Sequence, residues 1–274
     1  MTKIILSADS TCDLGDELKA KYQVHYYPFH IILGDKQYQD NVDITPEEIF
    51  QAYWERKILP KTAAIGVGEY LDYFRKWVEN GYQVIHLNLG SGISSAYQNC
   101  CMAARELGNV FPINSGNLSS AIGLLVVEAG PQIQKEIQEL TAKCHGSFVL
   151  DTLEFLHAGG RCSAVAALGA NLLRLKPCIE VNNRDATMRV GKKYRGDLDK
   201  VLVQYTRDKL MNRDDLNLDR CFLVNAGISK ERLNLVKKTI EECADFEHIY
   251  ITKASCTISC HCGPNTLGVM FLTK

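Results

Sequence analysis

The pattern of hydrophobic and polar positions predicts alternating strands and helices in the first part of the chain. Short runs rich in aliphatic and β-branched residues predict strands over 3–8, 24–33, 83–87, 110–113 and 147–151. Helical spacing predicts helices over 16–22, 45–56, 69–80, 97–107, 118–129 and 133–140. The run 36–38 is expected to return on 24–33 as a hairpin through Gly34 and Asp35. Such alternation favours a mostly parallel sheet.

The pattern changes after residue 152, where we place the boundary between two domains. A helical turn over 153–157 precedes a Gly-Gly-Arg loop and an Ala/Leu-rich helix over 164–173. The runs 176–181 and 187–190 predict a hairpin. Helices around 198–205 and 233–243, with strands over 221–225, 248–252 and 267–272, complete the chain. The sequence therefore predicts an α/β protein with domain 1–152 on a mostly parallel sheet and domain 153–274 on a mixed sheet.

A loop of glycine and serine over 89–95 lies between a predicted strand and a predicted helix. Gly90 and Gly92 permit a tight turn, and Ser91 or Ser94 could cap the helix. A helix N-terminus offers free N–H groups and the positive end of the dipole, which favours a carboxylate or phosphate. The alternative is an ordinary strand-to-helix loop with serine caps. The residues alone leave both interpretations open.

Composition and charge narrow the class of protein. The 274 residues include 31 basic and 32 acidic side chains, which gives a formal net charge of −1, and 46% are hydrophobic. No basic stripe or acidic tail points to nucleic acid. No leader pattern and no apolar run of about 18 residues predicts a signal peptide or a membrane span, so we expect a cytoplasmic protein.

Eleven cysteines are scattered mainly through apolar elements, and we expect them to be buried free thiols. The segment 256–264 also permits a metal hypothesis, in which Cys256, Cys260, His261 and Cys262 bind zinc. Its spacing lacks a second Cys-x2-Cys pair, and adjacent residues of an extended segment would not all point one way. We therefore predict no metal site.

Two further groups of polar residues suggest chemistry. Asp9, Ser10 and Thr11 follow the first predicted strand, where they could bind a ligand or form a hinge; alternatively Ser10 or Asp13 caps the next helix. Ser91 or Ser94 with His261 and Asp9 has the residue types of a serine hydrolase. However, Gly90-Ser91-Gly92 is not a Gly-x-Ser-x-Gly elbow. The glycine loops also match neither a Walker sequence nor a dinucleotide fingerprint.

Taken together, a series of short motifs resembles the DegV family, the fatty-acid-binding proteins of bacteria. The motifs occur in the family's order over nearly the whole chain. They are Asp9-Ser10-Thr11, Asp40-Asn41-Val42-Asp43-Ile44, Pro60-Lys61-Thr62, Ser91-Gly92-Ile93-Ser94, Tyr97-Gln98, Asn114-Ser115, Gly159-Gly160-Arg161, Lys176-Pro177 and His261-Cys262-Gly263-Pro264.

The resemblance implies two α/β domains with one long-chain fatty acid, such as palmitate, stearate or oleate, between them and no other cofactor. Its carboxylate would be held by Thr62, Ser94 and His261, with Ser91, Gly160 and Arg161 as further ligand-binding residues. The resemblance also implies a carrier without catalytic activity of its own. It would present the acid to a separate ATP-dependent fatty acid kinase subunit, which forms acyl phosphate for phospholipid synthesis.

The sequence departs from the family pattern at three places. Thr62-Ala63-Ala64-Ile65 replaces Thr-Ser-Gln-Pro, Ser94-Ser95-Ala96-Tyr97 replaces Ser-Gly-Thr-Tyr, and Asn265 replaces the final glycine of His-x-Gly-Pro-Gly. The three head-group residues are retained, so the changes bear on loop shape and acyl-chain preference. Arg195 is the residue that we expect to face the kinase.

Overall fold

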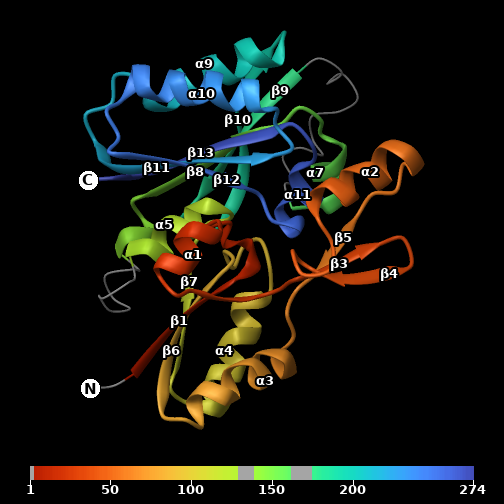
Figure 1. The fold of residues 1–274 in the computed structure, drawn as a ribbon, viewed down its shortest axis with the longest axis vertical. Helices are drawn as coiled ribbons and strands as arrows, with labels where there is room; N and C mark the ends of the chain where they lie inside the picture. The colour runs from red at the N-terminus through yellow and green to blue at the C-terminus, as the bar shows by residue number, and fades with distance from the viewer. Residues whose placement is uncertain (1–2, 129–138, 162–174) are drawn as a thin grey trace.

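The computed structural model describes residues 3–128, 139–161 and 175–274, which form three sheets with helices packed against them (Figure 1). The first sheet is entirely parallel, in the order β2-β1-β6-β7. Its strands are β1 (Lys3–Asp9), β2 (His25–Tyr27), β6 (Tyr82–Asn88) and β7 (Val110–Asn114). The predicted parallel sheet is thereby confirmed.

A small antiparallel sheet stands beside the first one, in the order β4-β3-β5. It contains β3 (His30–Leu33), β4 (Lys36–Gln39) and β5 (Lys61–Ala63). The expected hairpin is confirmed, but the expected single strand over 24–33 is wrong, because β2 and β3 belong to different sheets. Pro28 between them has no N–H for a ladder, and the Phe29 N–H donates to Ser10 Oγ instead.

The third sheet is mixed and has the order β10-β9-β8-β13-β11-β12. Its strands are β8 (Cys144–Val149), β9 (Leu175–Asn182), β10 (Thr187–Arg195), β11 (Leu216–Ala226), β12 (His248–Lys253) and β13 (Thr266–Thr273). Only β11 and β12 pair in parallel. We expected the strand at 147–151 to extend the first sheet; instead β8 lies between β9 and β13. The domain division at residue 152 stays a prediction.

Helices cover the sheets and fill the space between them. They are α1 (Asp16–Lys21), α2 (Pro46–Arg56), α3 (Val67–Val78), α4 (Ala96–Leu107), α5 (Ser120–Glu128), α7 (Glu154–Gly159), α9 (Leu198–Leu210), α10 (Lys230–Cys243) and α11 (Cys256–Cys262), with a short 3-10 turn at Ser10–Cys12. None of these described helices is long and apolar enough to cross a membrane. The helices expected over 164–173 and over most of 133–140 lie outside the described residues.

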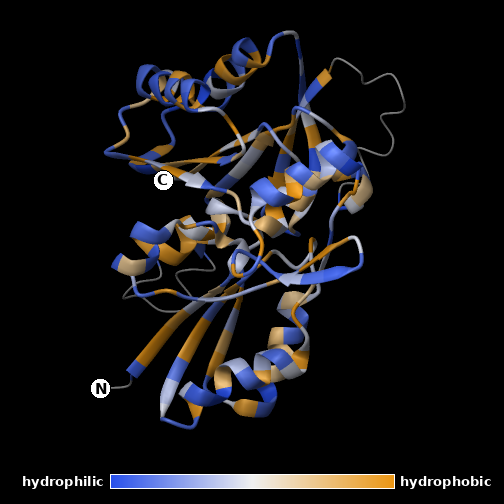
Figure 2. Ribbon diagram, turned by 45° about the vertical axis from the view of Figure 1, so that its right-hand side comes forward, coloured by the Kyte–Doolittle hydropathy of each residue, from blue (hydrophilic) through white to orange (hydrophobic). Residues whose placement is uncertain are grey.

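The core is organised around α5, which lies between the parallel and the mixed sheet and contacts strands of both (Figure 1). Every residue from Ser120 to Val127 is buried, as expected for a helix that is apolar nearly all round. On the opposite face of the mixed sheet, α9 and α10 show hydrophilic outer surfaces over hydrophobic strands (Figure 2). Apolar burial on both sides of the mixed sheet therefore fixes its position against α5.

Helix α11 was not predicted, since we treated 256–262 as extended. Its N-cap is Ser255, whose hydroxyl accepts from the Ile258 N–H. The first N–H groups are satisfied by distant carboxylates: Ser255 N–H donates to Asp13 and Cys256 N–H to Asp40, at 2.9 and 2.7 Å. Partners more than 200 residues away leave no local pattern, so periodicity could not reveal this helix.

The N-terminus of α2 offers a simple test of local stability. Thr45 and Glu48 form a capping box, in which each side chain accepts from the other's backbone N–H. We expect Thr45→Ala to lower the free energy of unfolding by about 1 kcal/mol. Urea titration followed by circular dichroism would measure the loss, and an unchanged midpoint would contradict it.

Candidate functional site

A cavity lies among the parallel sheet, the small sheet and the mixed sheet, and the empty space in it, counted with its opening to solvent, is about 750 Å³. Its wall is mainly apolar and includes Phe29, Leu89, Ile93, Leu118, Phe148, Leu156, Met188, Val224, Ile258 and Met270. The arrangement suits a long apolar ligand rather than a nucleotide or a sugar.

Four of the predicted site residues line this cavity: Thr62, Ser94, Arg161 and His261. Thr62 belongs to β5, Ser94 precedes α4, Arg161 follows α7, and His261 is on α11. Thr62 Oγ1 and His261 Nε2 are 2.8 Å apart, although 199 residues separate them in sequence. The fold thus brings hydroxyl, imidazole and guanidinium donors to one mainly apolar cavity, whose lining also includes Ser119, Asn225, Thr257 and Thr266.

His261 is held against the backbone of Gly159. A Cβ on Gly159 would lie 2.1 Å from His261 Nδ1, and this nitrogen has no hydrogen-bond partner among the described residues. Burial, and secondarily the positive charge of Arg161, lowers the pKa of His261 to about 4. The imidazole is therefore neutral near pH 7 and carries a single N–H.

Two buried carboxyl groups, those of Asp13 and Asp40, fix the other end of α11. Besides their bonds to the helix N-terminus, Asp13 accepts from the Ser119 hydroxyl at 2.5 Å and Asp40 from the Ser10 hydroxyl at 2.8 Å. Burial raises the pKa of both carboxyl groups, that of Asp13 to about 8. The helix that carries His261 is therefore tied to residues far from it in the chain. Neither Ser10 nor Asp13 caps α1, contrary to one of our alternatives, because α1 has no side-chain cap.

Ser94 stands at the start of α4, where its hydroxyl accepts from the Ala96 N–H at 3.2 Å. The N-cap residue of α4 is Ser95, which makes no side-chain cap, so the expectation that Ser91 or Ser94 caps this helix is wrong. Ser94 lines the cavity, and its role in holding an anion stays a prediction. Ser91 is placed differently. Its hydroxyl accepts from Asn114 Nδ2 at 2.8 Å, and it is not part of the cavity wall among the described residues. The structure does not bring Ser91 to the candidate site.

The Gly-Gly-Arg loop contributes through Gly159 more than through Gly160. Gly160 ends α7 in a left-handed conformation, with φ +65°, and is absent from the described cavity wall. Arg161 Nη1 donates to Gly159 O at 2.6 Å. We missed Gly159, and the paired glycines were the available signal, because one supplies the helix end and the other a close approach.

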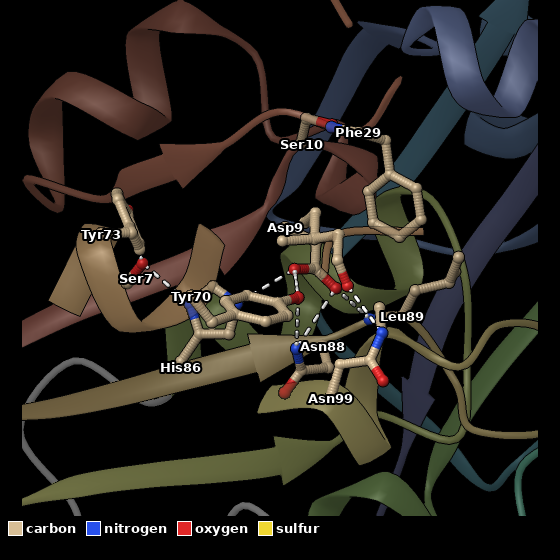
Figure 3. A network of polar contacts seen from close by, with 12 residues as sticks. Ser7, Asp9, Ser10, Phe29, Tyr70, Tyr73, His86, Asn88, Leu89 and Asn99 are labelled. Atoms are coloured by element: carbon tan, nitrogen blue, oxygen red, sulfur yellow. Dashed lines mark hydrogen bonds and ion pairs between the residues drawn. The ribbon is translucent and has the colours of Figure 1, made fainter. Parts of the chain in front are cut away.

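The residues of the hydrolase alternative are not assembled. Asp9 contacts His86, Tyr70 and the Leu89 N–H, in a network that does not include His261 (Figure 3). His261 has Thr62 rather than a serine at Nε2 and no carboxylate at Nδ1. A general base with a pKa near 4 and no orienting acid lacks the features of a hydrolytic triad.

The cysteines of α11 are packing residues in the described structure. Cys256 Sγ donates to Ile44 O at 3.2 Å, and burial raises the pKa of its thiol. All cysteines in the described ranges are free thiols, and none of them is exposed. Within those ranges, no cluster of three or more His, Cys, Asp or Glu residues has the arrangement of a metal site.

Arg195, at the end of β10, is exposed and pairs in register with Leu175.

Comparison with known proteins agrees with the architecture. Residues 2–274 match a family described as "Uncharacterised protein, DegV family". A DegV domain-containing protein of Clostridium acetobutylicum is 30% identical over 288 residues, covering 100% of both chains.

Two solved structures resemble the fold over the full length of this chain. One is described as "Fatty Acid Binding of a DegV family Protein from Thermus thermophilus", with 25% identity, a TM-score of 0.87 and 100% of each chain covered. The other is a stearic-acid-binding protein from Eubacterium ventriosum, with 25% identity, a TM-score of 0.81, and 100% of this chain and 99% of that chain covered. With a matching fold and a family match over nearly its whole length, the chain belongs to the DegV family.

Proposed function

We propose that this protein binds one long-chain fatty acid in the cavity, with the carboxylate beside Thr62, Ser94 and His261. The contact between Thr62 and His261, on the wall of an otherwise mainly apolar cavity, carries the proposal. Two relatives of the same fold are described as binding fatty acids, one of them stearic acid. Both the acyl chain and the head group would therefore find complementary surfaces.

Burial of the acyl chain would supply most of the binding free energy, and the hydrogen-bond donors would fix the orientation of the carboxylate. Burying about fifteen methylenes at roughly 0.8 kcal/mol each gives a gross stabilisation on the order of 12 kcal/mol. A buried carboxylate needs hydrogen-bond donors, and the hydroxyls with a neutral imidazole N–H supply them without a catalytic base. Arg161 adds a positive charge at the same wall.

We further propose that the protein is a cytoplasmic carrier that presents the acid to a separate ATP-dependent kinase subunit. This step rests on the family resemblance. The exposure of Arg195 leaves its charge accessible to a partner. Because the described site has no base-acid pair aimed at a nucleophile, a carrier role fits it better than the Ser/His hydrolase alternative.

The proposal predicts that the protein purifies with about one fatty acid per chain. Native mass spectrometry, followed by denaturation and lipid identification, would reveal the acyl chain directly. If no acyl chain is found and added palmitate or oleate does not raise the melting temperature, fatty acid binding is wrong.

Head-group variants test the placement of the carboxylate. We expect Thr62→Val, Ser94→Ala and His261→Asn each to weaken palmitate binding by about 1–3 kcal/mol, because the first two remove a hydroxyl donor and the third removes the imidazole that contacts Thr62. Ser91→Ala is the matched control, since Ser91 precedes the same helix but does not line the cavity. Equal affinities for all four variants would contradict this placement. Esterase turnover abolished by His261→Asn would favour the hydrolase.

A further inference from the structure

Asp9 is completely buried at the end of β1, and its two carboxylate oxygens are filled by hydrogen-bond donors (Figure 3). Oδ1 accepts from Tyr70 Oη–H at 2.7 Å and lies 3.0 Å from His86 Nε2. Oδ2 accepts from the Leu89 backbone N–H at 2.8 Å and from Asn88 Nδ2 at 3.4 Å. Both carboxyl oxygens of Asp9 are therefore engaged within the protein.

The other side of the network holds His86, which is also completely buried. The Ser7 hydroxyl donates to His25 O at 3.0 Å, and the same oxygen lies 2.8 Å from Tyr73 Oη and 2.9 Å from His86 Nδ1. His86 is therefore held through both ring nitrogens, by Ser7 on one side and by Asp9 on the other.

Asp9 and His86 thus form a buried contact at 3.0 Å, and each side chain is also held by hydroxyl or amide groups. Asp9 is therefore a rigidly held acceptor for the N–H group that its Oδ2 atom binds.

That second oxygen holds the start of the loop that carries the head-group serine. Leu89 lines the cavity with its side chain and gives its N–H to Asp9. From there the loop closes on itself: Gly90 N–H donates to Asn117 O at 2.9 Å, and Ser94 N–H donates to Gly90 O at 3.3 Å. The position of Ser94 consequently depends on where the backbone at Leu89 is fixed.

We propose that Asp9 is a positioning residue for the head-group loop 89–94. It does not line the cavity; it acts through the Leu89 N–H on the direction in which Ser94 meets a carboxylate. This inference rests on the proposed fatty acid site. It adds a buried polar network, within the parallel sheet, on which recognition of the carboxylate depends.

Ligand pairs test the positioning role. Affinities of palmitate and of its uncharged analogue hexadecanol define the part of binding that depends on the carboxylate. We expect Asp9→Asn to reduce the palmitate-to-hexadecanol preference about tenfold while hexadecanol affinity is retained. Tyr70→Phe, which removes only one donor to Asp9, provides a milder change in the same direction if Asp9→Asn does not fold.

Tyr73→Phe is the matched control, because its hydroxyl contacts Ser7 on the far side of the network and not Asp9. It should leave the preference unchanged. Equal loss of both ligands in Asp9→Asn and Tyr70→Phe would show a general structural role and overturn the positioning role. If the unmodified protein binds neither ligand, the proposed fatty acid site fails instead, so the two failures are distinguishable.

Discussion

Replacing Gly159 by alanine is expected to remove most of the preference for a carboxylate while leaving the apolar cavity able to bind an acyl chain. The added Cβ would lie 2.1 Å from His261 Nδ1 and 3.0 Å from Cε1, far inside contact distance. The ring is the end of a side chain, so it will move before the backbone of α7 does. Its contact with Thr62 Oγ1 would then be lost, and carboxylate binding should fall by roughly 1–3 kcal/mol or more.

Gly160 supplies the matched control for this substitution. It has φ +65°, and an added Cβ would meet nothing within 4 Å, so Gly160→Ala introduces backbone strain without touching His261. Gly160→Ala should lower stability by about 1–2 kcal/mol and preserve the ratio of palmitate to hexadecanol affinity. Isothermal titration with both ligands would separate the cases. An unchanged ratio in Gly159→Ala would contradict the role that we assign to this contact.

The second large effect expected is a dependence of stability on pH that originates in His261. Its pKa is lowered from 6.5 to about 4 in the folded protein, so the unfolded chain binds more protons than the folded one between these values. Stability due to this group is therefore fully present above about pH 6.5 and is lost as the pH falls toward 4. The shift corresponds to a loss on the order of 3 kcal/mol.

Asp13 acts in the opposite direction, because burial raises its pKa from 3.8 to about 8 and its contribution is lost as pH rises through that window. The measurement must isolate His261 from it. We therefore compare lipid-free protein with His261→Asn by urea titration at each pH. As pH falls from about 6.5 to 4, the free energy of unfolding of the unsubstituted protein should decrease relative to that of His261→Asn. Parallel curves would show that His261 is not buried as a neutral ring.

Much of the fold could be predicted because its helices and strands carry local signals. The capped start of α2 at Thr45-Pro46 and the wholly apolar α5 were read from neighbouring residues alone. Predictions failed where distant partners decide the outcome. The chain breaks at Pro28 because Ser10 takes the Phe29 N–H, and α11 forms because Asp13 and Asp40 hold its first turn.

The candidate site was predictable only in part, for a similar reason. Thr62 and His261 were grouped by resemblance, and the structure brings them into contact. Ser91 has the same residue type as Ser94 and lies three positions away, yet Asn114 binds it outside the cavity. Gly159 acts because it has no side chain, and Asp9 acts through the backbone N–H of Leu89. The residue type of neither one therefore predicts its role.

The place of β13 in the mixed sheet has a consequence for how the protein folds. This strand lies between β8 and β11, and it pairs residues 267–272 with residues 144–149. Contacts at such separation require the closure of a long loop before they stabilise anything, which raises the contact order and slows folding. Until β13 inserts, β8 and β11 present unpaired edges, which are sites for mispairing and aggregation. Since Gly268 and Met270 of β13 line the cavity, we expect the cavity to form late in folding, so that a fatty acid binds only after this slow step.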